Sequence, residues 1–213
     1  MSQTGAEPGV PRAYFEREPV VVARALIGCM VISNLGGERT SGRIIETEAY
    51  RGADDLASHA ARLRTGRVLV MREQVGIAYV YRSYGIHAML NVVAHAPGDI
   101  GAVLIRAVQP LEGLDVMRRR RGGMPDRGLC SGPGKLCIAL GITLDDHGLD
   151  LTRSELLRLT FGGSGHTPSV LASTRIGISR SAELPWRFFE AGNPLVSAHR
   201  RGTAVDDQGD IIH

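Results

Sequence analysis

Two carboxylates stand two positions apart in a segment with the composition of a β-strand. The segment 44–50 reads IIETEAY. Because side chains alternate along a strand, Glu46, Glu48 and Tyr50 share one face, with about 7 Å between the two carboxylates. Such a pair can act as an acid–base couple, although a strand face of this kind is more often simply solvated. Spacing alone does not choose between Glu46 and Glu48.

Tyrosines gather in the same part of the chain, where four of the five lie between positions 50 and 84. Tyr79 and Tyr81 share a strand face, and a cross-strand cluster in the core is the alternative explanation for them. Tyr84 stands beside Gly85 in an expected hairpin tip, so it is either an ordinary turn residue or a wedge that fills the gap left by an extruded nucleotide. Aromatic faces beside a carboxylate predict a pocket that stacks a nucleobase and activates a water.

Arginine supplies nearly all of the positive charge, since Lys135 is the only lysine in a chain of net charge +3. Arginine suits phosphate contacts, but codon usage in a GC-rich genome explains the excess as a whole. The run 118–121 ends an expected helix, where the helix dipole favours cations and phosphate contact is the alternative. Ser131, Gly134 and Lys135 precede or begin another helix, and their spacing predicts an anion site rather than a Walker loop.

The remaining composition excludes several classes of protein. No stretch reaches the ~20 apolar residues of a membrane span, and the first residues do not form a secretory signal. Cys29, Cys130 and Cys137 are too few for a disulfide framework and wrongly spaced for zinc, so we expect buried, reduced thiols in a cytoplasmic protein. No histidine has a metal-ligand spacing. The sequence therefore predicts neither a metal nor a cofactor.

Hydrophobic periodicity and turn residues predict one α+β domain. We expect strands at 29–33, 43–50, 78–81, 87–93, 102–107, 173–179 and 186–190, and helices at 19–27, 110–121 and 135–140. Residues 82–86 close a hairpin, and 51–76 are mostly loop with room for one helical turn. The expected fold is a curved, mostly antiparallel sheet with surrounding helices and a protruding β-hairpin. The expected divisions are a loose leader at 1–14, the domain at 15–200 and a tail at 201–213.

Taken together, the motifs resemble those of the 3-methyladenine (alkyladenine) DNA glycosylase family. The matching segments, in order, are ETEAY at 46–50, His59, YVYRSYG at 79–85, Asn91, LIRAVQPLEG at 104–113 and LCSGPGKLC at 129–137. The resemblance runs from about Phe15 to about Ser197. It departs from the family at 64–69, where a Thr-Pro-Arg-Asn-like stretch is usual, and at His87, where a bulky aromatic residue is common.

The resemblance implies a base-excision repair enzyme that flips a damaged purine out of duplex DNA and hydrolyses its N-glycosidic bond. Alkylated purines are the implied substrates, with deaminated and etheno purines as further candidates. Glu48 would be the general base that activates water, Glu46 its neighbour, and Arg106 would help to position that water. The single lysine lies in the phosphate-type loop, so an amine nucleophile is disfavoured and a monofunctional enzyme is expected.

The resemblance also assigns the pocket. Tyr50, His59 and Tyr81 would form stacking walls around the flipped base. Asn91 would stand where the amino group of a normal guanine would clash. Tyr84 would intercalate into the duplex.

Two other functions are compatible with the same residues. An inactive nucleic-acid-binding module would use the aromatic hairpin as a stacking platform. A hydrolase of free nucleosides would have no use for a wedge at position 84. With the glycosylase as the favoured function, we expect a monomeric, cytoplasmic bacterial protein whose partner is double-stranded nucleoid DNA containing damaged purines, with no membrane contact.

Overall fold

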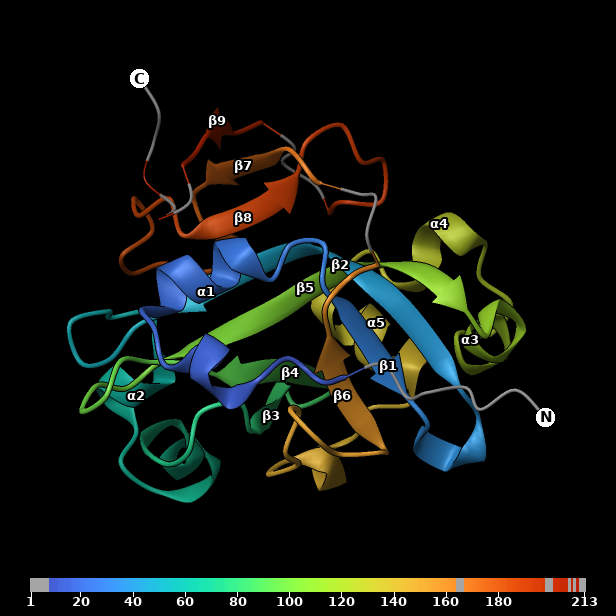
Figure 1. Ribbon diagram of the computed structural model, residues 1–213, viewed down its shortest axis with the longest axis horizontal. Coiled ribbons are helices and arrows are strands. Elements are labelled where there is room, and N and C mark those ends of the chain that lie inside the picture. Colours follow the sequence, from blue (N-terminus) through green and yellow to red (C-terminus); the bar gives the residue numbers. More distant parts are fainter. Residues whose placement is uncertain (1–7, 164–166, 198–200, 207, 209, 211–213) are drawn as a thin grey trace.

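The computed structural model describes residues 8–163, 167–197, 201–206, 208 and 210. In this part of the chain, nine strands form one antiparallel sheet that does not close into a barrel, with the order β3-β4-β5-β2-β8-β7-β9 and with β1 and β6 branching from β2 (Figure 1). The strands are β1 Met30–Ser33, β2 Thr40–Tyr50, β3 Ala78–Ser83, β4 His87–Val93, β5 Ala102–Glu112, β6 Leu157–Thr160, β7 Val170–Ser173, β8 Arg187–Glu190 and β9 Thr203–Ala204. The predicted α+β class is confirmed.

Strand β2 is the central element, and it carries both carboxylates. It pairs with β5 along one side, whereas its other side pairs first with β1, over Thr40–Arg43, and then with β8, over Glu46–Glu48. The register with β5 shifts by one residue at Ile45, which marks a β-bulge. Every side chain from position 44 to 49 is fully buried. The carboxylates therefore lie inside the protein and not on a solvated strand face.

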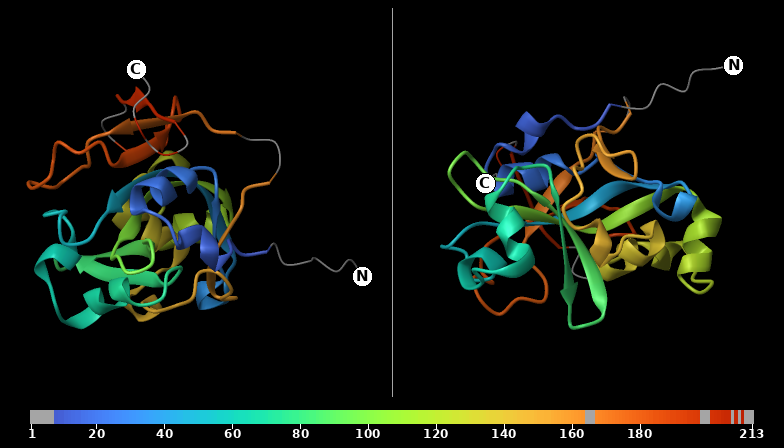
Figure 2. Two further views of the ribbon diagram at one scale, coloured as in Figure 1. Left: turned by 60° about the vertical axis from the view of Figure 1, so that its left-hand side comes forward. Right: turned by 90° about the horizontal axis from the view of Figure 1, so that it is seen from below.

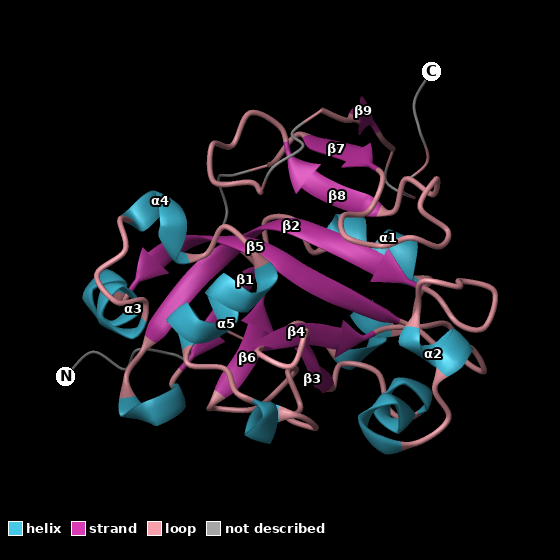
Figure 3. Ribbon diagram, turned by 180° about the vertical axis from the view of Figure 1, so that it is seen from behind, coloured by secondary structure: helices cyan, strands magenta, loops and turns pink. Residues whose placement is uncertain are grey.

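Helices cover both faces of the central strands. Helix α1, Pro19–Ala25, lies on one face, where the Thr47 hydroxyl donates a 2.7 Å hydrogen bond to the Ala23 carbonyl. Helix α5, Pro133–Leu140, packs on the opposite face, next to α3, Leu114–Arg120, and α4, Asp126–Leu129 (Figure 3). Apolar side chains from α1, α3, α4 and α5 join the sheet in one core. Thr47 thus faces α1, and the carboxylates face the other way, as the alternation predicted.

The hairpin formed by β3 and β4 projects from the body of the sheet (Figure 2). Its turn places Tyr84 at φ 49° and Gly85 at φ 71°, a left-handed conformation that glycine adopts readily and tyrosine does not. The Tyr84 side chain is 85% exposed at this tip. The expected protruding hairpin with an aromatic residue at its tip is confirmed.

The expected helix from Pro110 to Arg121 is wrong at its start. Strand β5 continues through Pro110 to Glu112, and α3 begins only at Leu114. The proline is tolerated in the strand because it lies next to a register irregularity opposite Gly42. Gly113 then makes the turn at φ 71°, and an added Cβ there would stand 2.4 Å from the Arg39 carbonyl oxygen. Gly113, and not Pro110, therefore stands at the boundary between β5 and α3.

Other boundaries moved as well. The expected loop at 51–76 contains helix α2, His59–Arg62, and a 3-10 segment, Gly66–Arg72. The strand expected at 173–179 ends at Ser173, and residues 174–179 form a loop instead. Further 3-10 segments occupy Arg12–Phe15, Leu35–Gly37 and Leu144–Asp146. Strands β6 and β9 were not expected.

The chain packs beyond both expected domain boundaries. Of the leader expected at 1–14, residues 1–7 lie outside the described residues, but Gly9 bridges to Thr160 in β6 and Val10 is fully buried. In the tail expected at 201–213, β9 pairs with β7 and Val205 is buried. The packed region therefore begins before Phe15 and extends past residue 200.

Candidate active site

A cavity of about 620 Å³ opens between the β3–β4 hairpin, helix α2, the adjacent part of β5 and the loop that follows β7. The side chains that line it include Tyr50, His59, Tyr81, Tyr84, Asn91 and Arg106. These are the four pocket residues expected from the sequence, with Tyr84, which was expected to intercalate, and Arg106, which was expected to help position a water. The fold thus brings residues from position 50 to position 106 to one place.

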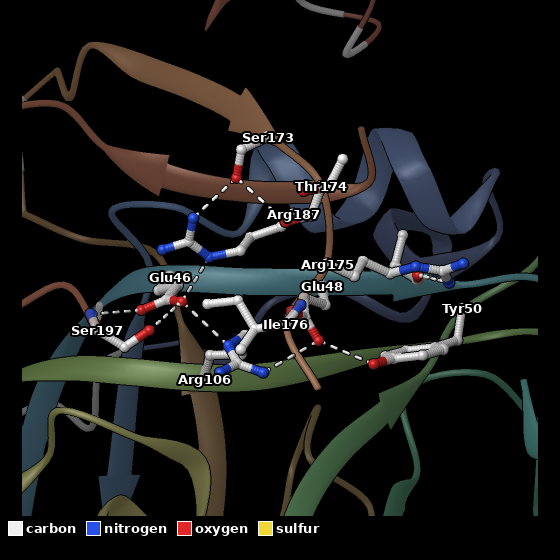
Figure 4. Close-up of polar contacts among 11 residues, drawn as sticks. Glu46, Glu48, Tyr50, Arg106, Ser173, Thr174, Arg175, Ile176, Arg187 and Ser197 are labelled. Atoms are coloured by element: carbon white, nitrogen blue, oxygen red, sulfur yellow. Dashed lines mark hydrogen bonds and ion pairs between the residues drawn. The ribbon is translucent and has the colours of Figure 1, made fainter. Parts of the chain in front are cut away.

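Glu48 lies immediately behind the lining of this cavity and is itself fully buried. Its Oε2 accepts a 2.8 Å hydrogen bond from the Tyr50 hydroxyl and lies 3.1 Å from Arg106 Nη1. Its Oε1 accepts a 2.7 Å hydrogen bond from the Ile176 backbone N–H (Figure 4). All three groups belong to residues that line the cavity. The Glu48 carboxylate is therefore held directly behind the cavity lining by groups from three different segments.

Glu46 lies on the same side of β2 but is engaged away from the cavity. Arg187 Nε and Arg106 Nε contact its Oε1 at 2.7 and 3.0 Å, and the Ser197 hydroxyl donates to the same oxygen at 2.6 Å. Burial raises the pKa of Glu46, but the guanidinium groups of Arg187 and Arg106 and the Ser197 hydroxyl outweigh it and lower that pKa below its ordinary value. Glu46 is thus a fixed anion that holds Arg106 in place, whereas Glu48 is contacted by residues of the cavity lining.

Arg106 connects the two carboxylates. Its Nε faces Glu46 and its Nη1 faces Glu48, so a single planar guanidinium is oriented by both. Burial lowers the pKa of Arg106, but the two carboxylates raise it more, and the net pKa lies above its ordinary value. The Arg106 guanidinium is therefore a permanent cation beside the Glu48 carboxylate.

One aromatic wall is built from the hairpin and helix α2. The Tyr79 and Tyr81 rings stack with 5.4 Å between their centroids, and His59 packs edge-on against Tyr81 at 4.4 Å. His59 Nδ1 lies 2.7 Å from the Tyr79 hydroxyl. Burial, with Arg62 as a smaller contribution, lowers the pKa of His59, while burial raises the pKa of Tyr81 to about 12. At neutral pH this wall is uncharged.

Tyr79 belongs to this wall although it was not among the expected pocket residues. It was considered as a core aromatic residue, and it is indeed buried in the core, but it also borders the cavity. Its alternation with Tyr81 along β3 was the available signal, because both side chains had to share one face.

Tyr50 and Asn91 also line the cavity. Burial and the neighbouring Glu48 raise the pKa of Tyr50 well above its ordinary value, so Tyr50 keeps the proton that it donates to that carboxylate. The Asn91 amide nitrogen donates to the carbonyl oxygens of Tyr79 and Met89 at 3.1 and 3.4 Å. Both of these hydrogen bonds use the NH2 group, which fixes the orientation of the amide at the cavity wall.

The expected phosphate residues lie outside the cavity lining. Lys135 is exposed, with its Nζ 3.4 Å from the Ser131 hydroxyl. Gly134 is buried, and an added Cβ there would stand 2.9 Å from both Cβ and Cγ of His87. The glycine therefore lets the hairpin rest on the start of α5 through His87, the position where the chain departs from the usual family pattern.

The arginine run at 118–121 is largely engaged with the protein itself. Arg118 contacts Asp126 at 2.8 Å and Asp115 at 2.5 Å, and Arg119 pairs with Glu38. Arg120 donates to the Leu35 carbonyl at 2.9 Å. These contacts support the structural explanation for the run.

Four residues that organise the site come from the last part of the chain and were not expected: Arg175, Ile176, Arg187 and Ser197. Their partners in β2 lie more than a hundred positions earlier. The local sequence at 173–179 suggested a strand and carried no signal for a loop that donates a backbone N–H to Glu48.

Within the described ranges, no group of three or more His, Cys, Asp or Glu side chains is placed to hold a metal ion. The three cysteines are free and buried, as expected. No helix in this part of the chain is both long and apolar enough to traverse a bilayer.

Comparison with known proteins agrees with the geometry. A sequence model of the methylpurine-DNA glycosylase family matches residues 13–194. A protein of Rhodopseudomonas palustris named as a 3-methyladenine DNA glycosylase is 46% identical, over 89% of this chain and 91% of its own length. Proteins with the same name from Carboxydothermus hydrogenoformans and Agrobacterium fabrum are 42% and 46% identical, over 88% and 89% of this chain and 98% and 93% of their own lengths.

The matched residues include both carboxylates, the aromatic hairpin and the loop that donates to Glu48. The resemblance inferred from the motifs is therefore confirmed. The chain belongs to the methylpurine-DNA glycosylase family of DNA repair enzymes.

Proposed function

We propose that this protein excises alkylated purines from duplex DNA by hydrolysing the N-glycosidic bond, with Glu48 as the base that activates water. The observation that carries the proposal is a buried carboxylate, fixed by three lining residues directly behind the wall of an aromatic cavity. An exposed tyrosine on a projecting hairpin stands beside that cavity. A flipped purine stacked in the cavity would bring its sugar carbon to the pocket floor.

The chemistry follows from the groups around the cavity. Glu48 accepts a proton from a water molecule as the water oxygen attacks C1′ of the sugar. Arg106 holds the carboxylate and the water in place. The purine leaves with the bonding electrons. Glu46 supplies the charge that keeps Arg106 oriented. Lys135 lies outside the lining, so the step uses water and not a lysine nucleophile.

The lining also favours a substrate class. The ionisable residues of its aromatic wall are tyrosines and one histidine, His59. Because the pKa of His59 is lowered, this wall is uncharged at neutral pH, and the charged groups of the lining are its arginines. A purine made cationic by alkylation is already a good leaving group and stacks well on electron-rich rings. Alkylated purines are therefore the proposed main substrates, with etheno and deaminated purines as slower ones.

Base release from defined duplexes tests the proposal. Duplexes that carry 3-methyladenine, 7-methylguanine, ethenoadenine or hypoxanthine are incubated in parallel, with and without a chelator. We expect release of the alkylated bases, without strand cleavage and at the same rate in chelator. Absence of release from all four duplexes, with tight binding to undamaged single strands, would instead support an inactive binding module.

The hairpin tip gives a second test, which concerns the duplex. We expect Tyr84→Ala to lower single-turnover release from duplex DNA about tenfold to a hundredfold, because stacking of an aromatic side chain on a base contributes about 1–3 kcal/mol. Tyr84→Phe keeps the ring and is the matched control, with a rate close to that of the wild type. Equal loss on free modified nucleosides would contradict the wedge role and favour a nucleoside hydrolase.

A further inference from the structure

An ion pair between Asp55 and Arg175 lies behind the cavity and plays no part in the mechanism described so far. Arg175 Nη1 contacts Asp55 Oδ2 at 2.6 Å, and Nη2 contacts Oδ1 at 2.9 Å. Both side chains are fully buried. A buried pair recovers its desolvation cost only with good geometry and further hydrogen bonds, and it is weak support for stability as such. Its other contacts therefore indicate its role.

The arginine side ties the loop after β7 to the strand that carries the carboxylates. Arg175 Nη1 also donates to the Ala49 carbonyl at 2.9 Å, and Nη2 donates to the Ser181 carbonyl at 3.1 Å. Ala49 lies between Glu48 and Tyr50 in β2. Residue 176 follows directly, and its N–H donates to Glu48 Oε1. Fixing Arg175 on β2 thus fixes the peptide group that orients the base.

The aspartate side ties down the segment that leads to the aromatic wall. Asp55 Oδ2 accepts from the Arg51 N–H and Oδ1 from the Ala57 N–H, each at 3.1 Å. This closes the loop between Tyr50 and His59, both of which line the cavity. One carboxylate therefore holds the loop that brings His59 to the pocket.

The guanidinium also lies over aromatic rings. Its Cζ is 4.8 Å from the Tyr50 ring centroid and 5.1 Å from that of Trp186. Tyr50 is the residue whose hydroxyl donates to Glu48 Oε2. Figure 4 shows Arg175 next to Tyr50, with Glu48 between Tyr50 and Arg106. Arg175 thus acts on both Glu48 oxygens, through Ile176 on one and through Tyr50 on the other.

We propose that Asp55 and Arg175 are positioning residues, which join the two walls of the cavity and set the orientation of the Glu48 carboxylate. They touch no substrate. Their effect on catalysis rests on the proposed role of Glu48, whereas their effect on the geometry of that carboxylate does not. Because one flat guanidinium serves Asp55, Ala49 and Ser181 together, a lysine ammonium at this position cannot replace it.

The activity test compares Arg175→Lys with a matched variant, Arg43→Lys. Arg43 on β2 also forms an ion pair and is mostly buried, contacting Glu190 at 2.9 Å and Gln109 at 2.6 Å, but it does not line the cavity. We expect Arg175→Lys to lower single-turnover base release about 10- to 100-fold with little change in lesion binding, since small displacements at a reacting centre have effects of that size. Arg43→Lys should retain the wild-type rate.

Rescue by a conservative variant separates positioning from a general loss of stability. Asp55→Glu keeps both charges and should restore part of the rate that Asp55→Asn loses, which a general loss of stability would not predict. A folded Arg175→Lys protein with the wild-type rate, or an Asp55→Glu protein no faster than Asp55→Asn, would overturn the proposal.

A measurement without turnover decides the same point. In NMR spectra at neutral pH, the Ile176 amide proton of the wild-type protein should lie downfield because its N–H donates to the Glu48 carboxylate, and Glu48→Gln should move it upfield. In Arg175→Lys the downfield position should be lost. If the wild type releases no base, the proposed function fails, but this comparison still tests the positioning. An Ile176 amide with the same chemical shift in the wild type and in Arg175→Lys would refute the inference.

Discussion

We expect Glu48→Gln to abolish base release and to leave binding of lesion-containing duplex intact. A positioned general base contributes about 10²–10⁴-fold to a rate, so the single-turnover constant should fall by at least that range. The two carboxylate oxygens accept hydrogen bonds from Ile176 and Tyr50, and Oε2 also forms an ion pair with Arg106. The NH2 group of the glutamine would face either the Ile176 N–H or the Tyr50 hydroxyl and the Arg106 guanidinium. Because a donor would then face a donor, a contact is lost in addition to the base. Release kinetics and equilibrium binding are measured on the same duplex.

The control for this variant is Glu112→Gln. Glu112 lies at the end of β5, with a half-exposed side chain that pairs with Arg39. The same chemical change there should leave release unaltered. Turnover by Glu48→Gln at a rate similar to that of Glu112→Gln would show that another group activates the water, and Glu46 would then be the first candidate.

The second large effect concerns stability. Arg187 is fully buried and contacts Glu46 at 2.7 Å and the Ser173 hydroxyl at 2.8 Å. Arg187→Met keeps most of the volume but removes the charge opposite Glu46. Because removing one partner of a buried pair leaves an uncompensated charge, we expect the free energy of unfolding to fall by about 3–5 kcal/mol. Denaturant titration at neutral pH measures it.

The loss of stability in Arg187→Met should depend on pH because of Glu46. Its folded-state pKa is lower than the unfolded value, so the pair stabilises the protein above the unfolded pKa of a glutamate, and this contribution is lost as pH falls. The difference in stability between wild type and Arg187→Met should therefore shrink in acid. Arg39→Met, in an exposed pair with Glu112, should cost at most about 1 kcal/mol at any pH. A pH-independent difference for Arg187→Met would mean that Glu46 is not its main partner.

Strands β1 to β5 and β8, with the hairpin, could be predicted because local signals were present there. The alternation through 44–50 correctly placed Glu46 and Glu48 on one face, opposite Thr47. Gly85 marked the turn of the hairpin, where the structure exposes Tyr84. Periodicity could not tell that this face is buried, because burial depends on β5 and β8, which pair with β2 from distant parts of the sequence.

The misplaced start of α3 has a local cause. Proline is common at the first position of a helix, but it is also tolerated in a strand next to a bulge. At Pro110 the register irregularity decided the outcome, and the sequence carries no separate mark of it. The loop at 174–179 was missed for a different reason, since the side chain of Arg175 binds partners more than a hundred positions away.

The long range of the contacts to β2 has a consequence for the newly made protein. Ribosomes deliver the chain from its N-terminus, so all of the pocket tyrosines and both glutamates emerge long before Ile176, Arg187 and Ser197. Until those late residues arrive, the Glu48 carboxylate lacks the backbone N–H that fixes it, and Glu46 lacks two of its partners. We therefore expect an unfinished or prematurely terminated polypeptide that stops before residue 175 to be unable to remove bases.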